Sequence, residues 1–225
     1  SGDHSFVGSR RDFPVHLTAA CREAAAADSH GIGIVLMRFA VDARLSKITS
    51  DGFVDRAFSD LGSWFVSGGY YGEKSVIKLI AFSGKEQTYQ SWWGLPEDKL
   101  KSDRTWNYYT YDNETDNYQQ DHYQLIYTGK VGSNWKTNLA LHYTYGRGYY
   151  EQFRENDRLS RYNLPNVVVG NEVISRSDII RRRWLDNDFY GFVGSANYVS
   201  TDGKLDFIIG GGANRYDGGH FGEII

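Results

Sequence analysis

Hydrophobic and polar residues alternate with a period of two in several stretches of the chain, most clearly in 135–146. A helix would spread both sets of residues around its circumference, whereas a strand separates them onto two faces. The stretch therefore predicts a β-strand with Leu139, Leu141 and Tyr143 on its apolar face and Asn138, His142 and Thr144 on its polar face. Its length suits a tilted strand that crosses a lipid bilayer, which needs ~9–11 residues.

Similar alternation or a strand-like composition recurs in six further segments, which are 39–46, 63–71, 75–88, 122–128, 190–198 and 204–213. About seven strands are therefore expected. The sequence predicts an all-β fold, an antiparallel meander from a transmembrane β-barrel that occupies most of 39–217. No helix longer than about ten residues is expected in that region.

The expected connections fall into two classes of length. Short turns are predicted at 72–74, 129–134 and 200–203, and the last contains an Asp-Gly pair that favours a hairpin turn. Two long loops are predicted at 90–120 and 152–183. Short turns at one end of a sheet and long loops at the other are typical of outer-membrane barrels.

The first 38 residues do not follow this pattern. The segment 16–29 is rich in alanine, which favours a short helix, and no aromatic residue occurs between Phe13 and Phe39. We therefore expect a non-matching N-terminal segment over 1–38, part helical or disordered, and a partial barrel over 39–225. The start of the chain lacks the basic and apolar regions of a signal peptide, so the natural start of an exported protein is expected further upstream.

The composition narrows the class of protein. Aromatic residues make up 16% of the chain, with 17 tyrosines, and 25 glycines stand against three prolines. Tyrosine and tryptophan suit a boundary between water and an apolar phase. A net charge of −3 does not favour a nucleic-acid partner, and a single cysteine (Cys21) excludes both an internal disulfide and a multi-cysteine zinc site. No cofactor or metal site is predicted, and no apolar run is long enough for a membrane helix.

Five stretches resemble the early barrel strands of Bacteroidetes TonB-dependent receptors, and these are 39–57, 63–94, 117–127, 138–153 and 213–223. The resemblance implies an importer in the bacterial outer membrane, whose barrel contacts membrane lipids and encloses a plug. It also implies a ligand such as an iron chelate, cobalamin or a glycan, and energy from the TonB complex. The family's plug and TonB-contacting segment have no counterpart here, and its barrels have about 22 strands.

The predicted loop 90–120 concentrates aromatic residues among aspartate and asparagine, and its candidate ligand-binding residues are Trp92, Trp93, Trp106, Tyr108 and Tyr109. Such rings can stack on a sugar or on an aromatic chelator. The alternative is an interfacial aromatic belt or packing between loops. In the second predicted loop, Arg154 and Arg158 are candidates for capturing carboxylate or phosphate groups, although charges at this height are more often solvated.

No constellation for catalysis is recognisable, so the protein is not expected to be an enzyme. His122 and His142 would share a polar face without a third metal ligand, which favours ordinary polar positions. Two alternatives to an importer remain. One is a soluble β-rich module that presents tryptophans to a glycan, and the other is a designed or chimeric protein without transport activity.

Overall fold

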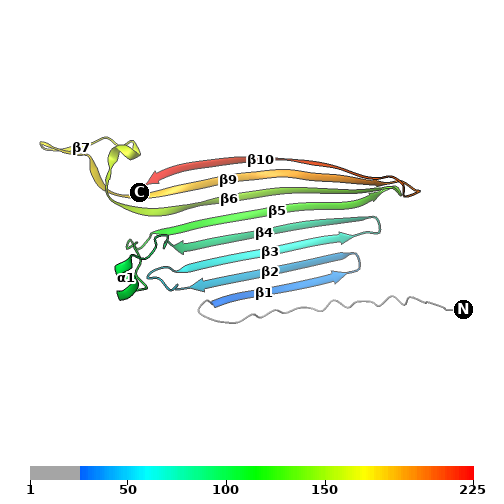
Figure 1. Ribbon diagram of the computed structural model, residues 1–225, viewed down its shortest axis with the longest axis horizontal. Coiled ribbons are helices and arrows are strands. Elements are labelled where there is room, and N and C mark those ends of the chain that lie inside the picture. Colours follow the sequence, from blue (N-terminus) through cyan, green and yellow to red (C-terminus); the bar gives the residue numbers. More distant parts are fainter. Residues whose placement is uncertain (1–25) are drawn as a thin grey trace.

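The computed structural model describes residues 26–225, and eight long strands in this region form one antiparallel sheet (Figure 1). Each strand pairs with its neighbour along the chain, except that β6 pairs with β9 across an inserted hairpin of β7 and β8. The sheet contains β1 (Ala26–Leu36), β2 (Phe39–Ser50), β3 (Ser59–Tyr71), β4 (Ser75–Tyr89), β5 (Thr115–Val131), β6 (Trp135–Arg158), β9 (Arg176–Val199) and β10 (Asp206–Ile224). The expected all-β meander is confirmed.

One face of the sheet, called here the apolar face, carries the hydrophobic positions of the alternating pattern. A single cross-strand row on this face contains Val41, Leu79, Leu125, Leu141 and Phe192. Their exposed fractions run from 37% for Leu125 to 61% for Leu79, so no second layer of the described residues covers them. Leu139 and Tyr143 lie on the same face as Leu141, as expected of a strand over 135–146, and the contact of this face with lipid stays a prediction.

The opposite face, called here the polar face, carries the residues between them. The adjacent row contains Asp42, Ser67, Ile80, Gln124 and His142. Ser67 donates a hydrogen bond to the Asp42 carboxylate. Polar groups thus face one side of the sheet while Val41 and Leu79 face the other, because successive side chains of a strand point in opposite directions.

The two ends of the sheet differ in the length of their connections (Figure 1). Short turns follow β3, β5 and β9, where Gly132 and Gly203 adopt the left-handed conformation that tight turns require. The connections at the other end span 51–58, 90–114 and 159–175, and we call it the long-loop end. The expected one-sided arrangement of loops is confirmed. Within residues 26–225 the sheet is open, since β1 and β10 each pair with a single strand there.

Three expectations from the sequence are wrong in their bounds. The segment 152–183 is not one loop, because β6 extends to Arg158 and β9 begins at Arg176, with η1 (Leu159–Tyr162), β7 (Val167–Val169) and β8 (Glu172–Ile174) between them. β5 begins at Thr115, inside the predicted loop 90–120. Residues 26–36 form β1, whereas 16–25 of the expected alanine-rich helix lie outside the described residues.

Helical structure is short in the described part of the chain. The six-residue helix α1 (Glu97–Ser102) begins after Pro96, with acidic residues in its first turn and lysines in its last, which suits the helix dipole. Among residues 26–225 no helix is long and apolar enough to cross a membrane. The buried hydrophobic side chains of this region, Tyr89, Tyr109, Leu159 and Ile179, all lie near the long-loop end.

Candidate functional site

The connection between β4 and β5, residues 90–114, folds back onto the ends of the strands instead of extending into solvent. We call this segment the aromatic loop. Gln90, the first residue after β4, is 1% exposed. Its side-chain amide donates hydrogen bonds to the carbonyl oxygens of Thr115 (3.2 Å) and Glu151 (2.9 Å). A buried amide requires such partners, so Gln90 ties both ends of the loop to β6.

A second buried amide joins the aromatic loop to the loop between β2 and β3. Asn107 is 4% exposed, and its Nδ2 donates to the carbonyl oxygens of Asp55 (2.9 Å) and Gln90 (3.1 Å). In the opposite direction, Arg56 donates from Nε and Nη2 to the carbonyl oxygen of Tyr109, at 3.1 and 2.6 Å. The two loops therefore pack as one unit at the long-loop end.

Glu151 on β6 is the buried charge beneath this unit, with 1% of its surface exposed. Its carboxylate accepts hydrogen bonds from Tyr111 Oη (2.8 Å), Asn113 Nδ2 (2.6 Å) and Arg182 Nε (2.8 Å). Burial alone would raise the pKa of Glu151, but the hydrogen bonds from Arg182, Asn113 and Tyr111 hold the pKa below its ordinary value. Burial and the bond to Glu151 raise the pKa of Tyr111 to about 12.

The aromatic rings of the same loop contact one another in a continuous series, which we call the aromatic cluster. Tyr108 is its centre, with ring centroids 5.5 Å from Trp93, 6.2 Å from Trp106 and 5.6 Å from Tyr109. Trp92 joins it through an edge contact with Tyr109 at 6.4 Å. All five predicted aromatic residues are therefore brought together, in the tilted and edge-on geometries that aromatic pairs favour.

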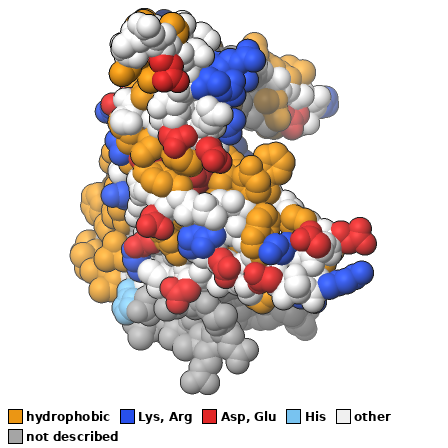
Figure 2. Space-filling view, turned by 90° about the vertical axis from the view of Figure 1, so that its left-hand side faces the viewer, with side chains coloured by type: hydrophobic (Ala, Val, Ile, Leu, Met, Phe, Trp, Pro, Cys, Tyr) orange, Lys and Arg blue, Asp and Glu red, His pale blue; other side chains and the backbone are white. Residues whose placement is uncertain are grey.

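Three rings of the cluster remain available for contact. Trp92, Trp93 and Tyr108 are 56%, 65% and 59% exposed, whereas Tyr109 is buried and Trp106 is partly covered by Lys99. Figure 2 views the long-loop end and shows hydrophobic side chains in its middle with acidic and basic ones around them. The buried members pack against the exposed rings and restrict their conformational freedom.

The two predicted arginines differ in their relation to this cluster. Arg154 lies close enough to lower the pKa of Tyr109 and of the buried carboxyl of Glu114, although burial raises both pKa values overall. It also makes a 3.8 Å ion pair with Asp157 beside a bulge in β6. Arg158 is the last residue of β6, and no described contact connects its side chain to the aromatic rings. Both arginines belong to a strand and not to the loop that was predicted.

The buried anchors were not predicted from the sequence. Gln90, Asn107 and Glu151 are single polar residues without a recognisable motif, and their burial follows from the folding back of the loop. Tyr150 was also missed, although its ring contacts Trp92 edge-on at 5.4 Å. Tyr150 lies in the aromatic-rich stretch that follows 146, and this local composition is the one sequence signal that could have indicated a role in the cluster.

The two histidines of the polar face take part in packing. His122 stacks on Phe82 with ring centroids 4.3 Å apart, and its Nδ1 lies 2.9 Å from Thr144 Oγ1. His142 packs against Phe189 at 4.8 Å. Within 26–225 no group of three or more histidine, cysteine, aspartate or glutamate side chains could hold a metal ion.

Comparison with known proteins shows a likeness in fold. No protein-family model matches the chain, and no curated protein does. Among solved structures, five chains match the fold of the sheet. One of them is the crystal structure of the open form of the ferric-catecholate import receptor Fiu from E. coli K12, with a TM-score of 0.59 and 13% sequence identity. The match covers 85% of this chain and 32% of that receptor, so the chain spans about a third of the receptor's length.

Proposed function

We propose that the chain is part of an outer-membrane importer of the TonB-dependent type, and that its aromatic cluster helps to capture a nutrient from outside the cell. The observation that carries this proposal is the position of three exposed rings, Trp92, Trp93 and Tyr108, at the long-loop end of a sheet with an apolar face. In barrels of the outer membrane the longer loops are the extracellular ones.

The exposure of the apolar face supports embedding in a membrane over a soluble module. A soluble sandwich would bury Leu79, Leu141 and Phe192 against a second sheet about 10 Å away. The only other sheet of the described residues is the hairpin of β7 and β8, which consists of three-residue strands. Lipid would cover the apolar face without any second layer.

The chemistry of the cluster supports a ligand with flat faces and anionic groups. Trp92 and Trp93 offer stacking surfaces, and Arg154 supplies a cation whose charge acts on Tyr109 of the same cluster. An iron chelate built from catecholates combines both features, and the structural neighbour is named for the import of such a chelate. Cobalamin and a glycan are the other candidates. The proposed source of energy is the TonB complex acting on the whole receptor. The resemblance of the five sequence stretches supports a receptor of the Bacteroidetes type.

The test is a titration of the full chain in detergent micelles with three probes, a ferric catecholate, cobalamin and a neutral oligosaccharide, followed by calorimetry. We expect saturable binding of one class only. We also expect that withdrawal of detergent precipitates the protein, because the apolar face then meets water.

Two outcomes would contradict the proposal. A chain that stays folded and monomeric without detergent would contradict the membrane location. A chain that keeps its β-sheet circular-dichroism signal in detergent but binds none of the three probes would contradict the capture of these ligands.

A further inference from the structure

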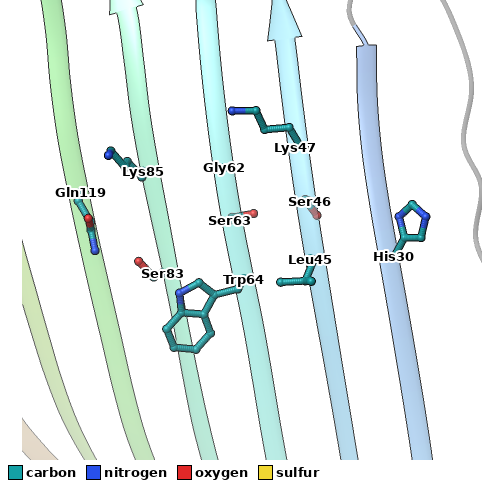
Figure 3. Close-up of a pocket in the computed structure, with 10 residues that line it drawn as sticks. All are labelled: His30, Leu45, Ser46, Lys47, Gly62, Ser63, Trp64, Ser83, Lys85 and Gln119. Atoms are coloured by element: carbon teal, nitrogen blue, oxygen red, sulfur yellow. The ribbon is translucent and has the colours of Figure 1, made fainter.

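An open groove of about 640 Å³ lies on the apolar face, toward the long-loop end, and crosses β1 to β5 (Figure 3). It is separate from the aromatic cluster, with which it shares no residue. Its upper part is lined by Lys47, Gly62, Lys85 and Gln119, and its lower part by Leu45 and Trp64. The groove therefore has a cationic part and an apolar part.

The cationic part is built from one cross-strand row. Gly62 pairs with Lys47 on one side and with Lys85 on the other. Neighbouring strands lie ~4.8 Å apart, so the two lysines stand ~10 Å apart with only a glycine between them. A Cβ atom at Gly62 would meet nothing within 4 Å, so the space between the lysines is open. Their flexible side chains can reach one anionic group placed there.

The positive charges of this row are not fully neutralised by ion pairs among the described residues. Lys47 makes an ion pair with Asp60 in which both side chains are about half exposed, and such pairs add little stability. Lys85 is exposed, and no ion pair to it occurs among the described residues. Gln119 lies in the same row and adds a hydrogen-bond donor. Its amide nitrogen Nε2 also donates to Asp121 Oδ1 at 3.2 Å.

The row marks the boundary of the apolar face. On β2 the next residue on the same face toward the short turns is Leu45, two positions from Lys47. On β4 the residues on this face that follow Lys85 in that direction are Ser83, Ala81 and Leu79. Figure 3 shows the Trp64 ring beside Ser83, which is 5% exposed. Lysine and tryptophan at the edge of an apolar surface are suited to a membrane interface, where their polar ends meet the headgroups.

We propose that the groove binds the phosphate-bearing headgroup of an anionic membrane lipid, with the phosphate between Lys47 and Lys85 and an acyl chain along Leu45 and Trp64. The inference rests on the proposed membrane location of the sheet. The charge of the row and the apolar floor beside it are complementary to the two parts of such a lipid. The site would hold lipid at the outer surface of the sheet and would not contact the imported ligand.

The test measures partition of the full chain from detergent into two kinds of vesicle by flotation. One kind contains phosphatidylcholine alone, and the other contains three parts phosphatidylcholine to one part phosphatidylglycerol. We expect the wild type to favour the anionic vesicles, less so at high salt. Lys85→Gln should weaken partition into anionic vesicles about fivefold and leave partition into neutral vesicles unchanged. Gly62→Glu, which places a carboxylate in the open gap, should have at least the same effect.

The matched control is Lys101→Gln, because this lysine of α1 is exposed at the same end of the sheet and its replacement changes the net charge equally. A change below about twofold is expected. Equal losses for Lys85→Gln and Lys101→Gln, or no loss for either, would overturn the headgroup site. Displacement by millimolar inorganic phosphate would also overturn it, in favour of a free-anion site. Failure of the wild type to enter either vesicle would instead contradict the membrane location itself.

Discussion

The phenol of Tyr111 donates a 2.8 Å hydrogen bond to the carboxylate of Glu151, which joins the aromatic loop to the strand beneath it. The partners are 40 residues apart in the sequence. Arg182 of the next strand occupies the other carboxylate oxygen at 2.8 Å and lies over the Tyr149 ring at 4.6 Å. Glu151 is therefore the point at which β6, β9 and the aromatic loop are held together.

Replacing Glu151 by glutamine tests this role. The side chain keeps its size but loses its charge, so Arg182 is left partly buried without its ion-pair partner. We expect a loss of about 3 kcal/mol in the free energy of unfolding, as is typical when one partner of a buried ion pair is removed. Urea denaturation in detergent would measure it. The control is Glu155→Gln, since Glu155 is exposed on the same strand, and a comparable loss there would contradict the role of Glu151.

The same carboxylate should make the docking of the aromatic loop sensitive to pH. Because the pKa of Glu151 is lowered in the folded state, its contribution is present above the ordinary carboxyl pKa of 4.5 and is lost as the pH falls through the lowered value. The pKa of Tyr111 is raised to about 12, so its contribution is present below its ordinary pKa of 10 and is lost as the pH rises toward 12. Maximal protection of 90–114 is expected between these limits.

Limited proteolysis of the aromatic loop across this pH range, with an acid- and base-tolerant protease or after rapid neutralisation, would show the dependence. The pKa of Glu114 is raised by burial, so protonation of Glu114 favours the folded state and partly opposes the loss at low pH. In the Glu151→Gln variant the acid-induced step should be absent. A wild-type step that survives this substitution would assign the acid sensitivity to another group.

Regular alternation explains which parts of the fold could be predicted. In 135–146 one face is apolar and the other polar, and the structure keeps that register. Beyond Gly146 the strand continues, but polar residues such as Glu151 and Gln152 occupy both faces, so the period-two signal disappears and the segment resembles a loop. β1 was missed because the alanines at 26 and 27 favour a helix in isolation, whereas pairing with β2 overrides that propensity.

The candidate site likewise has a part that the sequence could predict and a part that it could not. The rings at Trp92, Trp93 and Tyr108 could be proposed from composition, because aromatic residues gathered in a polar loop suggest stacking surfaces. Their support could not be proposed, since Asn107 and Glu151 gain their role only through partners far along the chain. Arg158 was proposed from local charge alone, and local charge carries no information on which side chains meet.

The pairing of β5 with β6 depends on a glycine at 148. A Cβ atom there would lie 2.1 Å from the carbonyl oxygen of Asn117 and 2.6 Å from Tyr118 Cα, and backbone atoms cannot move aside as a side chain can. We expect Gly148→Ala to destabilise the protein by about 1–3 kcal/mol. The control is Gly84→Ala on β4, where a Cβ atom meets nothing within 4 Å. Equal stabilities of the two variants in urea titrations would refute the close approach.

The exposed rings of the aromatic cluster should carry ligand affinity without carrying stability. Replacing Trp92, Trp93 and Trp106 together by alanine is expected to weaken binding of the probe that the wild type binds by a few kcal/mol, from typical losses of about 1–3 kcal/mol per good aromatic contact. Calorimetry with the ferric catecholate, cobalamin and the oligosaccharide would measure the loss. The urea midpoint should fall only slightly, because Trp92 and Trp93 are more than half exposed.

Two further variants separate stacking on the ligand from packing within the loop. The double variant Trp92→Ala, Trp93→Ala retains Trp106, which lies under Lys99 at 5.7 Å, and should show most of the loss of affinity. Trp135→Phe alters a ring at the opposite end of the sheet, where it contacts Tyr198 at 5.0 Å, and should leave affinity unchanged. Normal affinity in a folded double variant would remove the exposed rings from ligand capture. A triple variant that no longer folds, beside a double variant that folds and binds normally, would show that Trp106 packs the long-loop end and that the cluster is structural.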